Sequence, residues 1–321
     1  MKTKIIIAAV IIAAAALLAL VSIPSKKNPA TRNTLSEIRL DYANWSPIGL
    51  VLRQQGYLEE DLKKDGIRVR WVFSQGSNKS MEFLRSGSVD VGSSAGVAAL
   101  ISFINGNPVK TVYITTTPEW TALLLKPGST VKDVAGLKGK TIAATPGTDP
   151  YVFMVRTLAG AGLSLNDVKV VTLQHPDGKN ELLRGRVDAW AGLDPLMAQA
   201  ELAGARYLYR NVGFNTYNVI SVRREFAEAH PEIVTRVLAA YEKARKWAQE
   251  HPAEYLALVA KEAKITPEVA KLLLERTGLN DAAFTGKQEL SLIEAGNALR
   301  KSGSYAGALD LNYRDFSRQY E

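Results

Sequence analysis

The chain has 321 residues, of which 46% are hydrophobic and 22% charged, and its formal net charge is +8. This composition is ordinary for a globular protein, and it excludes a disordered chain and a membrane protein with many spans. Cysteine is absent, which excludes disulfides, thiolate metal sites and a thiol nucleophile.

Two further binding classes are disfavoured by the pattern of residues. Basic residues are scattered, apart from the pairs Lys26-Lys27 and Arg223-Arg224, so we expect no nucleic-acid partner. The three histidines lie far apart in the sequence or before prolines, so we expect neither a metal site nor a cofactor.

The N-terminus differs in character from the rest of the chain. Lys2 and Lys4 precede an uncharged apolar segment from Ile5 to Ile23, which has the two regions of a secretory signal. As a helix this segment would rise about 28 Å, close to the thickness of a hydrocarbon core. Residues 1–24 are therefore predicted to be a signal peptide or a retained N-terminal anchor of an exported, periplasmic protein, and residues 25–36 a polar linker.

Strands and helices then alternate along the chain. The segments "EIRLDY", "GIRVRWVF", "VDVGSS" and "VKTVYITTT" have the pattern of strands, and helices are predicted after the first three, with Ser46 and Ser77 as N-caps of two of them. A second series runs through "TALLLK", "KTIAAT", "VKVVTL", "VDAWAG" and "ARYLYR". This alternation is typical of α/β folds.

The two series echo each other, and a helical region follows them. "FLRSGSVDVG" (83–92) and "LLRGRVDAWAG" (182–192) each end a helix with Leu-Arg and begin a strand with Val-Asp, which indicates two similar α/β lobes. After "YNVISVRREF" the pattern is helical, with prolines at the first positions of predicted helices.

The stretch "TPGTDPY" (145–151) joins a predicted strand to a predicted helix through a small-residue loop. Asp149 suits the N-cap, and Pro150 suits the first helical position. A loop of this kind points free backbone N–H groups and the positive end of the helix dipole beyond the sheet edge, where anionic or polar ligands bind. An ordinary capped helix without a ligand remains the alternative.

Four longer segments carry a family resemblance: "GSVDVGSSAGVAALISFINGNPVKTV", "VKDVAGLKGKTIAATPGT", "RVDAWAGLDPLMAQAE" and "VRREFAEAHPEIV". In this order they resemble the solute-binding proteins of ABC importers, specifically the group that binds aliphatic sulfonates, taurine, nitrate or thiamine-pyrimidine compounds. The resemblance covers nearly all of residues 37–321.

This resemblance implies an α/β, two-lobed, periplasmic-binding-protein-like (type II) fold with two hinge crossings and a helical C-terminal region. Lobe 1 would comprise 37–117 and 217–321, lobe 2 would comprise 118–216, and the hinges would lie near Thr115–Pro118 and Asn215–Asn218. The expected ligand is a small sulfonate or amine-bearing solute held between the lobes. The expected partner is an ABC permease in the inner membrane, and the protein is expected to be a monomer and not an enzyme.

Loops that follow the carboxyl ends of strands supply the candidate ligand contacts. Ser46 and Ser94 could equally be plain N-caps, and each tryptophan among the candidates could equally be core. The candidates are Trp45, Ser46, Gln75, Gly76, Ser93, Ser94, Trp120, Gly147, Thr148, Asp149, Asp177, Trp190 and Asp194.

Asp149 and Asp194 would bring two carboxylates toward one cleft. They would repel a bare anion and favour a zwitterion whose amine binds a carboxylate. Alternatively, Asp149 caps its helix and Asp194 orders the loop before Pro195.

Two rival functions remain. An enzyme of the thiamine-pyrimidine-synthesis type is disfavoured because it calls for a cysteine-rich segment, and a membrane-anchored ligand sensor would be favoured by a retained N-terminus.

Overall fold

The computed structural model describes residues 35–279 and 286–303, with side chains described in the last helix from residue 291 onward. The predicted segment 1–24 and most of the linker lie outside these residues. Among the helices of the described part, none is long and apolar enough to cross a membrane.

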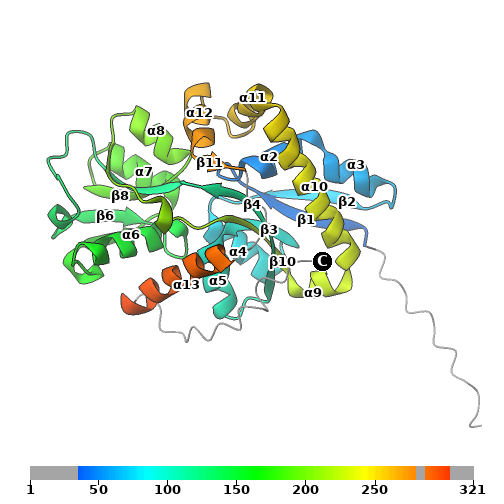
Figure 1. Ribbon diagram of the computed structural model, residues 1–321, viewed down its shortest axis with the longest axis horizontal. Helices are drawn as coiled ribbons and strands as arrows, with labels where there is room; N and C mark the ends of the chain where they lie inside the picture. Colours follow the sequence, from blue (N-terminus) through cyan, green and yellow to red (C-terminus); the bar gives the residue numbers. More distant parts are fainter. Residues whose placement is uncertain (1–34, 280–285, 304–321) are drawn as a thin grey trace, which may run out of the picture. The chain divides into compact units, whose positions relative to one another are not determined.

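Eleven strands of the described residues form two sheets (Figure 1). The first has the order β11-β4-β10-β3-β1-β2, in which β1 pairs in parallel with β2 and β3, while β10 runs antiparallel to β3 and β4. Its strands are β1 (Glu37–Tyr42), β2 (Arg68–Phe73), β3 (Val91–Ala95), β4 (Val109–Pro118), β10 (Asn218–Arg223) and β11 (Thr277–Gly278).

The second sheet has the order β7-β6-β8-β5-β9. Strands β6, β7 and β8 are parallel, and β5 runs antiparallel to β8. Its strands are β5 (Thr121–Leu125), β6 (Thr141–Ala144), β7 (Lys169–Thr172), β8 (Ala189–Leu193) and β9 (Arg206–Tyr209).

The helices connect and cover these strands, as the predicted alternation requires. Along the first sheet they are α2 (Pro47–Gln55), α3 (Tyr57–Lys63), α4 (Ser77–Ser86) and α5 (Gly96–Ile104); along the second they are α6 (Asp149–Gly160), α7 (His175–Leu183) and α8 (Leu196–Leu202). The helical C-terminal region holds α9 (Arg224–Ala229), α10 (Pro231–Glu250), α11 (Pro252–Glu262), α12 (Pro267–Glu275) and α13 (Gly286–Lys301). Proline stands in the first turn of six of these helices, where it leaves no hydrogen bond unmade.

The chain passes between the two sheets at two places. Strand β4 ends at Pro118 and β5 begins at Thr121 in the other sheet, while β9 ends at Tyr209 and β10 begins at Asn218 back in the first sheet. The predicted hinge segments lie at these passages. That they bend, and that the lobes divide at 117 and 217, stay predictions.

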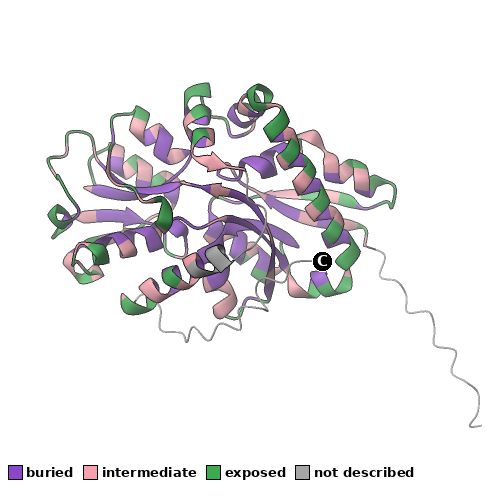
Figure 2. Cartoon of the chain, viewed as in Figure 1, coloured by how far each residue is buried: buried purple, intermediate pink, exposed green. Residues whose placement is uncertain are grey.

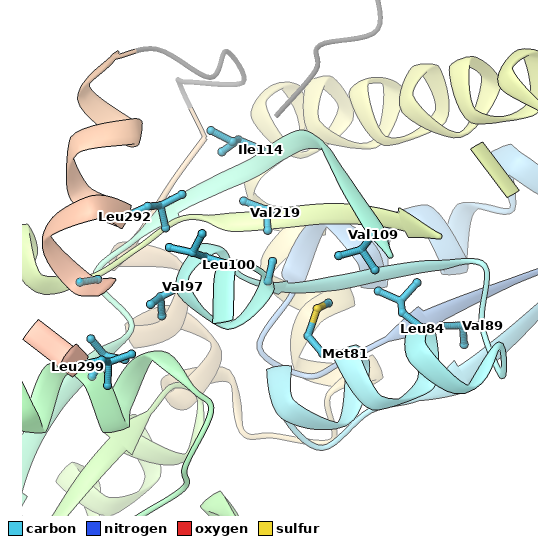
Figure 3. Packing of buried hydrophobic residues seen from close by; sticks show 13 residues of the cluster. Met81, Leu84, Val89, Val97, Leu100, Val109, Ile114, Val219, Leu292 and Leu299 are labelled. Atoms are coloured by element: carbon cyan, nitrogen blue, oxygen red, sulfur yellow. The ribbon is translucent and has the colours of Figure 1, made fainter. Parts of the chain in front are cut away.

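The buried residues lie mainly on the strands and on the helix sides that face them (Figure 2), and most of them are apolar. One cluster joins α5 of the first sheet to α13, where Leu292 packs with Val97 and Leu100 (Figure 3). A Cβ added to Gly96 would lie 2.9 Å from Leu292 Cδ2, so the absence of a side chain at Gly96 allows this close packing. The second sheet has cores of its own on its two faces.

Candidate ligand-binding site

A pocket of about 130 Å³ lies where loops from the two sheets meet. Its lining comes from the carboxyl ends of β1, β2 and β8, from the start of α7 and from the loop after α11. Ligands of open α/β sheets bind in such places. The lining residues are Asn44, Trp45, Phe73, Ser74, Gln75, His175, Pro176, Leu193, Asp194, Pro195, Leu196, Gln199, Ala263 and Ile265.

A larger cavity of about 490 Å³ lies between α6 and α13. We favour the smaller pocket as the functional site because none of the predicted contact residues lines the larger cavity. The larger cavity opens along helix flanks, far from the strand ends that ordinarily supply ligand contacts.

Three helix N-termini come together beside the small pocket. A Cβ added to Gly76, the N-cap of α4, would lie 3.3 Å from Cδ2 of His175, the first residue of α7. One added to Gly147, just before α6, would lie 3.9 Å from Cβ of Asn78 in α4. Free N–H groups and positive dipole ends from both sheets therefore converge, which is an arrangement suited to an anion.

Several buried polar atoms around these helix starts have no hydrogen-bond partner within the described part of the chain. They include Nε1 of Trp45, Oδ1 of Asn78, Oε1 of Gln174 and Nε2 of His175. Buried polar atoms are nearly always paired in folded proteins, so a gathering of unpaired ones marks a place where a ligand or water supplies the partner.

Asp149 is held by residues of both passages between the sheets. Its Oδ2 accepts hydrogen bonds from Nε1 of Trp120 at 2.7 Å and from the backbone N of Thr216 at 2.8 Å. Burial raises the pKa of this carboxyl to about 6. The prediction that Asp149 is the N-cap is wrong: Thr148 occupies that position, Asp149 lies in the first helical turn, and its carboxylate turns to the passages instead.

Asp194 lies in a completed ion-pair cluster. Its side chain is 0% exposed, accepts from the backbone N of Ala198 at 2.9 Å, and pairs with Arg276 Nη1 at 3.2 Å. Arg276 also pairs with Glu201 at 2.5 Å. Burial raises the pKa of Asp194 to about 6, against the opposing effect of Arg276. The carboxylate lines the pocket, but its charge is already balanced by Arg276.

The other candidates are placed as follows. The rings of Trp45 and Trp120 pack edge to face with their centroids 5.6 Å apart, so the structure brings these two candidates into contact. Ser46 accepts from Asn218 Nδ2 at 3.0 Å, and Ser93 donates its backbone N–H to buried Asp41 at 2.7 Å.

Two further candidates, Thr148 and Ser94, and the expected N-cap Ser77 lie at helix starts or strand ends. Thr148 donates its hydroxyl to the carbonyl of Thr145. Oγ of Ser94 is buried in β3 without a partner among the described residues. The expected Ser77 N-cap is wrong, because Gly76 takes that position and Ser77 Oγ accepts from the backbone N of Ala95.

Of the candidates, Trp45, Gln75 and Asp194 line the pocket and the others do not. Trp190 is 0% exposed and packs in the core of the second sheet, against Gly178 of α7. Asp177 is exposed in the first turn of α7. Neither lines the pocket described above.

Sequence reasoning missed His175, Asn78 and Arg276. The predicted contact Asp177 belongs to the first turn of α7, but the residues of this turn that line the pocket are His175 and Pro176. Arg276 had no local signal, because its partners are Asp194 and Glu201, far away in the sequence.

The two-sheet architecture with these helix starts defines a periplasmic-binding-protein-like fold, which confirms the predicted fold class. Residues 49–255 match the family described as NMT1/THI5 like, and the chain belongs to that family. It is 30% identical over 257 residues to a Bacillus subtilis protein named as a binding protein for aliphatic sulfonates, covering 76% of this chain and 74% of the relative.

Solved structures agree on the fold. The alkanesulfonate-binding protein SsuA from Xanthomonas axonopodis pv. citri, bound to MOPS, has a TM-score of 0.77 at 23% identity, covering 84% of this chain and 93% of that one. The desulfurization enzyme DSZB has a TM-score of 0.63 at 15% identity, covering 86% and 95%. The fold alone is therefore shared by binding proteins and an enzyme.

Proposed function

We propose that the protein is the periplasmic solute-binding component of an ABC importer and that its solute is a small sulfonate. The observation that carries this proposal is the meeting of three helix N-termini, from α4, α6 and α7, beside a pocket with unpaired polar atoms. The relative named for aliphatic sulfonates supports it. On this proposal the protein is a monomer, delivers its solute to an inner-membrane permease and catalyses no reaction.

A sulfonate suits this site for electrostatic reasons. It is a monoanion whose oxygens only accept hydrogen bonds, and backbone N–H groups at helix starts only donate them. Among the described residues, those that line the pocket include no lysine or arginine. The negative charge would therefore be bound by N–H dipoles, with Trp45 Nε1 as a further donor and Leu193 and Ile265 beside the carbon chain.

The residues proposed to contact the solute come from both sheets. Gln75, Gly76 and Trp45 belong to the first, and Gly147 and Thr148 belong to the second. Since these residues lie on both sides of the passages at 118–121 and 209–218, binding is expected to bring lobes 37–117 plus 217–321 and 118–216 together. X-ray scattering with saturating ligand should then give a smaller radius of gyration, and an unchanged radius would contradict closure.

A ligand screen tests the function directly. Thermal unfolding of the purified mature chain is followed with ethanesulfonate, nitrate and a thiamine pyrimidine, each at the same concentration. A ligand at 100 times its dissociation constant stabilises the folded state by about 2.7 kcal/mol. We expect ethanesulfonate to raise the unfolding temperature and the others to leave it unchanged; stabilisation by nitrate or the pyrimidine alone would overturn the sulfonate assignment.

A further inference from the structure

The protonation of His175 can be deduced from its surroundings. Nδ1 of His175 lies 3.2 Å from Oγ1 of Thr145, and that hydroxyl donates its single hydrogen to the carbonyl oxygen of Leu173 at 2.6 Å. Because the hydroxyl has no second hydrogen, Oγ1 can only accept from His175. Nδ1 therefore carries a proton and donates it to Thr145.

The second nitrogen of this ring is consequently a hydrogen-bond acceptor. His175 is 0% exposed, and burial lowers its pKa to about 4, so the ring is neutral near pH 7. A neutral histidine with a proton on Nδ1 has a bare lone pair on Nε2. Within the described residues this Nε2 has no partner.

The charged groups on the neighbouring elements are paired with other residues or exposed, so none of them stabilises the protonated form of this ring. In the pocket wall Asp194 is paired with Arg276. On α7, Lys179 donates to Gln199 at 2.7 Å and Asp177 is exposed. On α4, Lys79 pairs with Glu82 at 2.6 Å.

A bare alkanesulfonate leaves this lone pair unsatisfied. Its oxygens carry lone pairs themselves, so they would repel Nε2 of His175, and its methyl and methylene groups donate nothing useful. A solute that satisfies the site must combine acceptor oxygens, for the helix N–H groups, with one hydrogen-bond donor for His175.

Building on the proposed sulfonate function, we propose that the solute is a sulfonate that bears a hydroxyl group and that this hydroxyl donates to Nε2 of His175. An ammonium group suits the site less well than a hydroxyl. The carboxylate of Asp194 is balanced by Arg276. Oδ1 of Asp149 has no partner among the described residues, but Asp149 does not line the pocket. An ammonium group at His175 would therefore have no free carboxylate in the pocket wall and would lie beside three positive helix ends.

A matched pair of ligands tests this proposal. Ethanesulfonate and 2-hydroxyethanesulfonate differ only by the hydroxyl, and titration calorimetry gives the dissociation constant of each. We expect the hydroxylated ligand to bind at least about tenfold more tightly. Equal binding, or tighter binding of ethanesulfonate, would overturn the hydroxyl assignment while leaving the sulfonate function intact; binding of neither would overturn the sulfonate function itself.

A variant then assigns the preference to one residue. In His175→Phe the ratio of the two dissociation constants should fall to near one, because the acceptor is gone. In the matched control His230→Phe, at the border of α10, the ratio should stay as in the wild type. A ratio that persists in a folded His175→Phe protein would place the hydroxyl elsewhere and overturn the proposal.

The tautomer can be measured without a ligand, which keeps the proposal testable if the variant does not fold. Nitrogen-15 NMR of the imidazole rings distinguishes protonated from bare nitrogens. We expect a protonated Nδ1 and a bare Nε2 on His175 at pH 7. A proton on Nε2 would overturn the proposal, since the ring would then offer the solute a donor.

Discussion

Two polar clusters lie at the junction between the sheets, and they differ in how completely their atoms are paired. Around Asp194 both carboxylate oxygens have partners, in Ala198 and Arg276. Around Gly76, buried atoms of Asn78 and His175 have no partner among the described residues. A completed cluster stabilises the fold, whereas an incomplete one offers hydrogen bonds to a ligand. Hydrogen-bond pairing therefore separates polar residues that stabilise the fold from polar residues that can bind a ligand, and the sequence alone does not show this difference.

The largest expected effect lies in the completed cluster. Replacing Arg276 by methionine removes the partner of a fully buried carboxylate and should lower the free energy of unfolding by about 3–5 kcal/mol. Urea unfolding measures this loss. In the control Arg210→Met, the lost partner Glu119 is 29% exposed, so the loss should be only about 0–1 kcal/mol. Equal losses would contradict a special role for the buried cluster.

Acid should weaken the fold through His175. Its pKa is about 4 in the folded protein and about 6.5 when unfolded, so between these values the unfolded state binds more protons and stability falls as the pH falls. Relative to His175→Phe, the wild type should lose about 2–3 kcal/mol of unfolding free energy between pH 7.5 and pH 4.5.

The comparison with the variant is needed because other groups oppose this trend. Burial raises the pKa of Asp41, Asp149 and Asp194 to about 6. The folded state then binds more protons than the unfolded state between about pH 4 and 6, so these carboxyls favour folding as the pH falls. They are common to both proteins and cancel in the difference. If the free energy of unfolding changes with pH by the same amount in the wild type and in His175→Phe, His175 does not titrate as described.

A smaller effect is expected on ligand affinity at the incomplete cluster. In Gly76→Ala the new Cβ would lie 2.8 Å from Asn78 Oδ1 and 3.3 Å from His175 Cδ2, which displaces both side chains. The backbone there is extended, so alanine causes no backbone strain. We expect sulfonate affinity to fall about tenfold, by calorimetry, with the helix content unchanged. In the control Gly160→Ala, where a Cβ meets no described atom within 4 Å, affinity should not change.

The sequence was sufficient for most of the fold because strand and helix patterns are local. Alternation and proline positions located every strand of the two sheets except β11, and the start of α2 and α10, within a residue or two. Local rules failed at two helix caps. Asp149 and Ser77 are good capping residues, but their side chains form contacts with Trp120, Thr216 and Ala95, which are distant in sequence.

The site could be predicted at the level of loops and not of single residues. Loops that follow the carboxyl ends of strands can be selected from the sequence because their position in α/β folds is general. Which side chain enters the pocket depends on helix orientation and on neighbours such as Thr145, which no local pattern encodes. The ion pair of Asp194 could not be predicted, because its partner Arg276 lies 82 residues away in the sequence.

Trp45 and Trp120, whose ring centroids lie 5.6 Å apart, allow the same comparison between two neighbouring side chains of one type. Nε1 of Trp120 donates to Asp149 at 2.7 Å, whereas Nε1 of Trp45 has no partner in the described ranges 35–279 and 286–303. Both rings are buried, with 2% and 5% exposure. Tryptophan-to-phenylalanine variants therefore remove the same atoms from similar surroundings, and the difference between them reports the hydrogen bond.

Trp120→Phe should accordingly unfold more easily than Trp45→Phe, by about 1–2 kcal/mol, because it leaves the buried carboxylate of Asp149 without one donor. Trp45→Phe should instead weaken sulfonate binding about fivefold, since a donor aimed at the solute is lost. Urea unfolding and calorimetry on both variants give the four numbers. If the two variants lose equal stability and equal affinity, then pairing in the structure does not distinguish residues that hold the fold from residues that hold the solute.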